Sequence, residues 1–154
     1  MMFHEIAPKT LTENVFSLIG DRWMLITAGT PDHCNTMTAS WGGLGVLWGK
    51  NVATIYIRPQ RYTYEFVERS DFFTLAFFGR EYHKALALCG AKSGREVDKA
   101  KACGFTVAAG EGKAPYFEQA ELVLVCRKRY AQEMDPQAIP QDAKDRFYPE
   151  KDYH

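Results

Sequence analysis

The sequence predicts a mainly β protein with short helices, in which an antiparallel barrel carries helical insertions. Segments rich in β-branched and aromatic residues outnumber the segments with helical character. The predicted helices are short, and they do not alternate regularly with strands as they would in a doubly wound sheet. A length of 154 residues suits one hydrophobic core, so we expect residues 1–154 to form a single domain.

The first half of the chain is predicted to contain one helix and three strands. Thr10 and Glu13 have the spacing of a capping box, which predicts a short helix that runs toward Ile19. The strands are predicted at residues 23–28, 35–41 and 52–57, with a turn at residues 29–32 between the first two. The glycines of residues 42–45 are expected to interrupt regular structure.

The second half is predicted to contain further short helices and strands. The helices are predicted at residues 63–69, 82–88 and 93–102, the second ended by Gly90 and the third opened by a capping box at Ser93 and Glu96. The strands are predicted at residues 72–78, 105–108 and 121–130, the last with Leu122, Leu124 and Cys126 on one face and Val123 and Val125 on the other. From Asp135 onward, three prolines and many charges predict irregular structure.

Composition and charge bear on the class of partner. Nineteen basic residues balance nineteen acidic ones, whereas a domain that binds nucleic-acid phosphates usually carries a basic excess. We therefore expect no nucleic-acid partner. Aromatic residues make up 14% of the chain, and flat apolar surface of this kind suits a ligand site or a large subunit interface.

The sequence also predicts a cytoplasmic protein that does not enter a membrane. Residues 1–6 have neither the basic region nor the apolar stretch of a signal peptide. The longest apolar run, within residues 72–78, is far too short to cross a bilayer. The four cysteines form no CxxC pair and no histidine pair has ligand spacing, so we expect reduced thiols and no metal.

Three common catalytic or nucleotide-binding motifs fail in the sequence. In the glycine-rich residues 42–49, Trp48 stands where GxGxxG requires its third glycine, and Gly49-Lys50 is followed by Asn51 rather than Ser or Thr. The chain has no GxSxG motif. The glycine-rich residues are interpreted either as backbone that bends or approaches another group closely, or as backbone on which a ligand lies.

Three polar segments remain as candidate sites, each with an ordinary structural alternative. Residues 35–41 place an amide, three hydroxyls and an indole N–H on one predicted strand, and the alternative is a strand with a solvated hydroxyl face. Residues 58–63 place two arginines and a threonine at a predicted helix start, which suits a phosphate, and the alternative is two solvated arginines beside a turn. Residues 93–99 bring Lys99 to a helix start, and their capping box does not explain this lysine.

In this order and spacing, the three segments resemble the flavin reductase-like, FMN-binding split β-barrel family, and its flavoredoxin branch in particular. The matching stretches are residues 35–42, residues 52–63 with the pattern Arg58-Pro59-x-Arg61-x-Thr63, and residues 72–75, 93–99 and 104–106. The resemblance covers the chain from about Arg22 onward.

The resemblance implies a split β-barrel that forms homodimers, with FMN as the cofactor at the subunit interface. The FMN-binding residues that it implies are Asn35, Thr36, Thr38, Ala39, Ser40, Trp41, Arg58, Arg61, Thr63 and Lys99. Among these, Asn35 and Trp41 are expected at the isoalloxazine ring, and Arg58 and Thr63 at the phosphate. A flavin needs an apolar slot, hydrogen-bond donors at its ring edge and cations at its phosphate.

The activity that the resemblance implies is that of an FMN-binding oxidoreductase, which passes electrons from NAD(P)H or a redox partner through bound FMN. No side chain is required as a general base, because the flavin carries the redox chemistry. The alternative is a non-enzymatic FMN-binding electron carrier without nicotinamide turnover. The sequence leaves the electron donor and the electron acceptor open.

Overall fold

The computed structural model of the protein describes residues 3–154, so the first two residues of the N-terminal segment considered above lie outside the described part. The strands are β1 (Met24–Gly29), β2 (Cys34–Ala39), β3 (Gly42–Leu47), β4 (Lys50–Ile55), β5 (Phe72–Phe77), β6 (Val107–Ala109), β7 (Pro115–Phe117) and β8 (Leu122–Arg127). The α-helices are α1 (Val15–Gly20), α2 (Tyr62–Arg69), α3 (His83–Ala91), α4 (Lys99–Cys103) and α5 (Gln141–Phe147). Short 3-10 turns are η1 (Pro8–Thr10), η2 (Arg80–Tyr82), η3 (Glu111–Lys113) and η4 (Pro136–Ala138).

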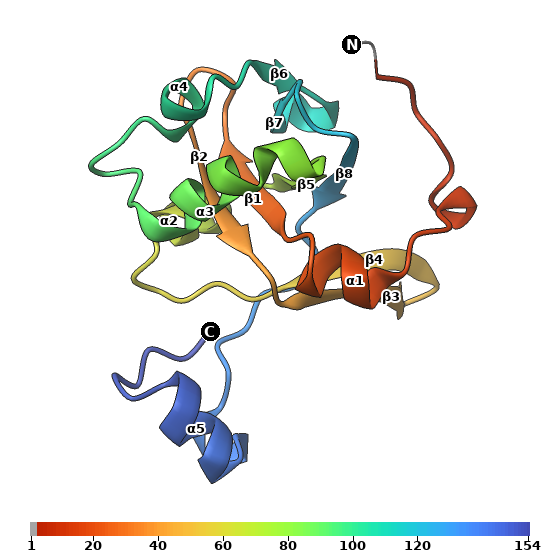
Figure 1. Ribbon diagram of the computed structural model, residues 1–154. Helices are drawn as coiled ribbons and strands as arrows, with labels where there is room; N and C mark the ends of the chain where they lie inside the picture. Colours follow the sequence, from red (N-terminus) through yellow and green to blue (C-terminus); the bar gives the residue numbers. More distant parts are fainter. Residues whose placement is uncertain (1–2) are drawn as a thin grey trace.

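A four-stranded antiparallel sheet in the order β2-β1-β5-β8 forms the centre of the molecule. Two hairpins, β3–β4 and β6–β7, accompany it. In Figure 1, α2 and α3 lie across β1 and β2, and α1 lies beside the β3–β4 hairpin. The predicted combination of antiparallel sheets and short helices is confirmed, since the longest helix, α3, has nine residues.

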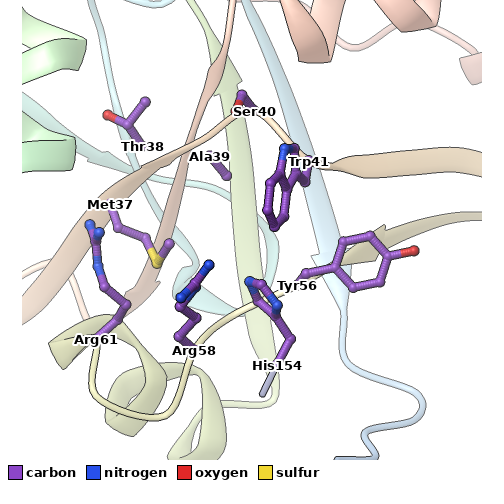
Figure 2. Close-up of a pocket in the computed structure, with 9 residues that line it drawn as sticks. All are labelled: Met37, Thr38, Ala39, Ser40, Trp41, Tyr56, Arg58, Arg61 and His154. Carbon is purple, nitrogen blue, oxygen red and sulfur yellow. The ribbon is translucent and has the colours of Figure 1, made fainter. Parts of the chain in front are cut away.

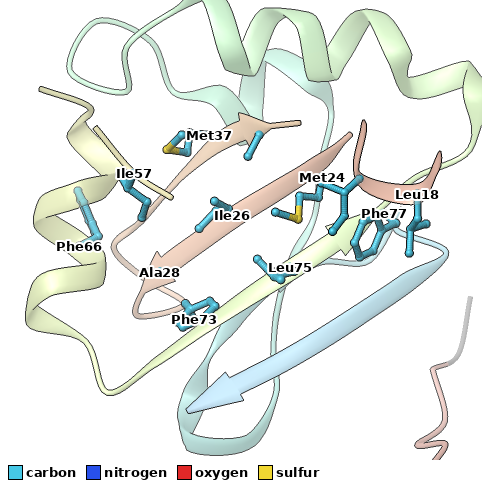
Figure 3. Packing of buried hydrophobic residues seen from close by; sticks show 12 residues of the cluster. Leu18, Met24, Ile26, Ala28, Met37, Ile57, Phe66, Phe73, Leu75 and Phe77 are labelled. Atoms are coloured by element: carbon cyan, nitrogen blue, oxygen red, sulfur yellow. The ribbon is translucent and has the colours of Figure 1, made fainter. Parts of the chain in front are cut away.

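The central sheet is buried on both faces, because alternate residues of its strands enter two separate cores. Met24 and Ile26 of β1 point into the first core, which α1, α2 and the β3–β4 hairpin cover (Figure 3). Leu25 points into the second core, which α3 covers. The predicted alternation along the last strand is confirmed, since Leu124 packs against the first core and Val123 against the second.

The expectation that the glycines of residues 42–45 interrupt regular structure is wrong. They belong to β3, which pairs with β4 over its full length. Trp48 and Gly49 form the connecting turn with positive φ angles of 52° and 68°, as a two-residue type I′ hairpin turn requires. Cross-strand pairing therefore outweighs the low β propensity of glycine.

The predicted capping boxes do not begin the helices. Asn14 caps α1 and Asp98 caps α4, in each case with a side-chain oxygen that accepts a backbone N–H, whereas Thr10 lies in η1. Gly90 lies inside α3 rather than after it. A Cβ at Gly90 would lie 3.3 Å from the Cβ of Thr38, so the close approach of α3 to β2 explains this glycine.

Besides β3, two further regions contain regular structure that was not predicted from the sequence. One is the short strand β7, which pairs with β6. The other is the region from Asp135 onward, which was expected to be irregular but contains η4 and α5. Figure 1 shows α5 projecting from the sheets, and the chain then returns toward the loop between β4 and α2. Among residues 3–154, no helix is both long and apolar enough to cross a membrane.

Candidate functional site: two pockets that share Arg61

Two pockets of about 160 Å³ each share the side chain of Arg61. The first, the Trp41 pocket, is lined by Met37, Thr38, Ala39, Ser40, Trp41, Tyr56, Arg58, Arg61 and His154 (Figure 2). The second, the Thr63 pocket, is lined by Asn35, Arg61, Tyr62, Thr63, Gly90, Ala91, Lys92, Ser93, Gly94 and Lys99. Nine of the ten residues predicted to bind flavin line one pocket or both, and Thr36 lines neither.

Three segments far apart in the sequence position these side chains. Strand β2 and the residues that follow it carry positions 35–41 past both pockets. The loop after β4 supplies Arg58, and Arg61 is the residue that precedes α2, with extended backbone at φ −70° and ψ 133°. The connection between α3 and α4 closes the Thr63 pocket from the other side. The site therefore depends on how β2, α2 and α3 pack together.

The two arginines of the site have different surroundings. Arg58 donates from Nη1 to Asp152 Oδ2 at 2.8 Å, and its guanidinium lies 5.0 Å from the ring centre of Tyr148. Arg61 donates from Nη1 to Gly90 O at 3.2 Å, but its Nη2 is buried without a partner in the described part of the chain. Burial, and then the charge of Arg58, lower the pKa of Arg61. A buried, unpaired guanidinium N–H is costly, so an anion at this point would be stabilising.

The Thr63 pocket contains a buried amide–hydroxyl pair. Asn35 Nδ2 donates to Thr63 Oγ1 at 2.8 Å, and Thr63 is only 1% exposed. Gly94 approaches this pair so closely that a Cβ there would overlap the Asn35 amide. Gly94 lies in the polar segment of residues 93–99, and the lack of a side chain lets its backbone pass close to Asn35.

Lys99 is 5% exposed. Its Nζ donates to Thr36 O at 2.7 Å and to Cys89 O at 2.8 Å, so it joins β2 to α3. Burial, and then the nearby charge of Arg61, lower the pKa of Lys99 from 10.5 to about 8. The ammonium group is therefore largely engaged by the backbone, with one N–H left after these two hydrogen bonds.

The hydroxyls of the predicted strand point to different places. Thr36 shares a 2.8 Å hydrogen bond with Thr27 and donates to Ile26 O at 3.1 Å, so its hydroxyl is used inside the sheet. Thr38 lines the Trp41 pocket but donates to Leu86 O of α3. Ser40 is exposed at the pocket and is the hydroxyl of this set best placed to meet a ligand.

Sequence reasoning missed Tyr56 and His154, which line the Trp41 pocket, and Phe147, which packs against Trp41. Figure 2 shows the His154 imidazole between Arg58 and Tyr56, below the indole of Trp41. The ring centres of His154 and Trp41 are 5.6 Å apart, and Phe147 meets Trp41 edge-on at 5.1 Å. The concentration of Phe, Tyr and His at residues 147–154 was the available signal. It was overlooked because the surrounding prolines and charges predicted irregular structure.

The structure thus combines antiparallel sheets with a pocket in which two arginines, Arg58 and Arg61, lie beside the aromatic side chains of Trp41 and Tyr56. A family model described as "Flavin reductase like domain" matches residues 16–139. The chain belongs to this family, and the resemblance inferred from the sequence is confirmed.

Solved structures agree with this fold. A flavoredoxin from Methanosarcina acetivorans is similar with a TM-score of 0.64 and 23% identity, over 88% of this chain and 67% of that chain. The flavoredoxin of Desulfovibrio vulgaris (Miyazaki F) gives 0.65 and 22%, over 87% and 69%. An FMN-binding protein from Thermus thermophilus with bound p-hydroxybenzaldehyde gives 0.63 and 20%, over 87% and 73%. The comparison with curated proteins returned no match.

Proposed function

We propose that the protein is an FMN-binding oxidoreductase of the flavin reductase-like type, with residues 1–154 as a single domain. The observation that carries the proposal is the buried Arg61 Nη2, a donor without a partner in the described residues, next to a second arginine. A phosphate would satisfy that donor with a charge-assisted hydrogen bond. The similar proteins named as flavoredoxin or FMN-binding protein favour FMN as the group that carries this phosphate.

The residues of the two pockets divide the work of holding FMN. Arg58 and Arg61 bind the phosphate, and Trp41 and Tyr56 provide aromatic surface for the ring. The neighbouring backbone at residues 39–40 offers polar groups to the ring edge. When bound, FMN supplies hydride and electron transfer. The protein supplies binding and orientation, and the positive charge of the arginines favours an anionic ligand.

The other predicted residues hold the backbone around the two pockets in place. Asn35 and Thr63 form the floor of the Thr63 pocket, and Lys99 fixes β2 against α3. Thr36 and Thr38 act through their hydrogen bonds within the fold rather than through free hydroxyls. This assignment moves the phosphate contact from Thr63 to Arg58 and Arg61, because the Thr63 side chain is only 1% exposed and its hydroxyl lies against the Asn35 amide.

The binding proposal is tested by comparing FMN with riboflavin, which lacks the phosphate. Arg61→Met removes the unpaired donor, so it should weaken FMN binding by about 10- to 100-fold and leave riboflavin binding nearly unchanged. Arg129→Met, at an exposed arginine outside both pockets, serves as the matched control. Titration calorimetry or flavin fluorescence measures both ligands. Equal losses for FMN and riboflavin, or FAD as the main flavin extracted from protein loaded with both, would contradict the proposal.

Nicotinamide turnover separates the reductase from the electron carrier. One similar structure is named as an NADH:FAD oxidoreductase from Streptomyces globisporus C-1027, which favours the reductase. Two others are named as flavoredoxins, which favours the electron carrier. We favour turnover with NAD(P)H. Anaerobic addition of NADH or NADPH to the loaded protein should bleach the absorbance of oxidised flavin. A protein that keeps its oxidised spectrum under both donors, but is reduced by dithionite, is the carrier instead.

A homodimer with FMN at the subunit interface is part of the proposal. Apolar side chains at the tip of the β3–β4 hairpin are exposed, with Val46 at 73% and Trp48 at 61%, and Tyr130 lies near Trp48. Surface of this kind is enriched at interfaces. Light scattering of the flavin-loaded protein should report two chains per particle, and a monomer at micromolar concentration would contradict this part. The cytoplasmic location remains a prediction from the sequence.

A further inference from the structure

Residues 148–154, here called the strap, return from α5 and lie against the Trp41 pocket. Asp152 places its Oδ2 2.8 Å from Arg58 Nη1, and Gln60 Nε2 donates to the same oxygen. The ion pair is partly shielded from water, with side-chain exposures of 27% for Arg58 and 15% for Asp152. Hydrogen bonding from Arg58 lowers the pKa of the Asp152 carboxyl, so the carboxylate is charged at neutral pH.

The strap holds together through contacts among its own residues and with the pocket wall. Tyr148 Oη and His154 Nδ1 are 2.5 Å apart, and Arg58 lies over the Tyr148 ring. The imidazole of His154 in turn faces Trp41 and Tyr56, with ring centres at 5.6 Å and 6.1 Å. The strap therefore covers Arg58 and the rings of Trp41 and Tyr56 at the same time.

A carboxylate and a phosphate bind a guanidinium in the same way, since both accept charge-assisted hydrogen bonds from its N–H groups. Asp152 accepts such a hydrogen bond from Arg58, while the nearby Arg61 Nη2 remains without a partner in residues 3–154. A phosphate dianion bound to both arginines would lie close to the Asp152 carboxylate and be repelled by it. The carboxylate and the phosphate cannot both use Arg58 favourably.

We propose that the strap is an internal competitor of the flavin, in which the Asp152 carboxylate occupies the phosphate position on Arg58 and His154 covers the ring position. Binding of FMN must then displace residues 148–154, and the affinity for FMN is reduced by the free energy that holds the strap in place. This inference rests on the proposed function, because it takes FMN as the anion that competes.

The direct test is Asp152→Asn, which keeps the size of the side chain and removes its charge. FMN should bind this variant about three- to tenfold more tightly than the wild type, while riboflavin changes less. Glu121→Gln is the matched control, because Glu121 forms an ion pair of the same 2.8 Å length with Arg22 outside both pockets. Equal or weaker FMN binding by Asp152→Asn would overturn the competition while leaving the proposed function intact.

A second measurement follows the strap itself. Trypsin cleavage after Lys151 should become faster when FMN is added to the wild type, because the strap leaves the pocket, and riboflavin should accelerate it less. Protection of Lys151 by FMN would overturn the inference, since the strap would then complete the site instead of competing for it. Failure of every protein to bind FMN would overturn the proposed function, and the inference with it.

Discussion

The two pockets that share Arg61 satisfy their polar side chains in different ways. In the Thr63 pocket, Asn35 donates to Thr63, and Lys99 donates to two backbone carbonyls of the fold. Around the Trp41 pocket, Nη2 of the shared Arg61 and Oδ1 of Asp152, which pairs with Arg58 of this pocket, are buried without partners within residues 3–154. The first pocket is therefore fixed by the fold, whereas the second is open to an exchange of partners. Stability should be concentrated in the first pocket and ligand response in the second.

The largest effect is expected from breaking the Thr63 pocket at Lys99. Lys99→Met keeps the length of the side chain but leaves the carbonyls of Thr36 and Cys89 unsatisfied, which should lower the free energy of unfolding by about 2–4 kcal/mol. Lys101→Met, at an exposed lysine of the same helix α4, is the control. Urea denaturation measures both variants. Equal stability of the two would mean that Lys99 does not hold β2 to α3.

The pH dependence of the free energy of unfolding tests the lowered pKa of the same lysine. Its pKa is lowered from 10.5 to about 8 in the folded chain. Between about pH 8 and 10.5 the unfolded state therefore holds a proton that the folded state has lost, so the free energy of unfolding should increase with pH across this window. Denaturation curves of the wild type against Lys99→Met isolate the contribution. A parallel pH profile for the two proteins would contradict the prediction.

Thr63→Val separates a role inside the pocket from a direct phosphate contact. The substitution leaves the buried Asn35 amide without its acceptor, so stability should fall by about 1–3 kcal/mol, and FMN and riboflavin should weaken alike. Thr63→Ser keeps the hydroxyl and is the control. Binding titrations with both flavins provide the measurement. A loss confined to FMN would restore Thr63 to the phosphate site that the family resemblance implies.

The smallest effect is expected in the Trp41 pocket. Phe147→Ala removes the ring that meets Trp41 edge-on at 5.1 Å, and the global stability should change by less than about 1 kcal/mol, since such a pair adds little beyond its buried area. Local hydrogen exchange of residues 148–154 should nevertheless accelerate, because the strap loses an aromatic support. A global loss as large as that of Lys99→Met would remove the contrast between the two pockets.

Much of the fold followed from local pattern. Runs of apolar, β-branched and aromatic residues located strands of the central sheet, and alternation assigned the two faces of the last strand. Local pattern failed at β3, where pairing with β4 overrides glycine propensity, and at the helix starts, where Asn14 and Asp98 rather than the predicted boxes supply the caps. The two failures have the same cause. Several residues could have capped a helix or interrupted a strand, and only the tertiary contacts of the folded chain determine which of them do so.

The candidate site was found by its segments rather than by its contacts. Residues 35–41, 58–63 and 93–99 do line the two pockets, but the division of labour inside them was not visible. The sequence shows Lys99 and Arg61 as two basic residues beside helices. In the structure, Lys99 donates to backbone carbonyls, whereas Arg61 has a buried donor with no partner among residues 3–154. Burial and hydrogen-bond partners create this difference, and neither is a property of local sequence.

The sequence by itself determined the antiparallel class, the two faces of the last strand and the three polar segments, because periodicity and residue type act over a few neighbouring positions. Only the tertiary structure decided which polar groups are satisfied and which side chain faces Arg58. Asp152 lies 94 residues from Arg58 in the chain, and only the path from α5 back to the loop after β4 brings the two charges together. An ion pair of this kind depends on position in space, so only the folded chain shows which carboxylate faces Arg58.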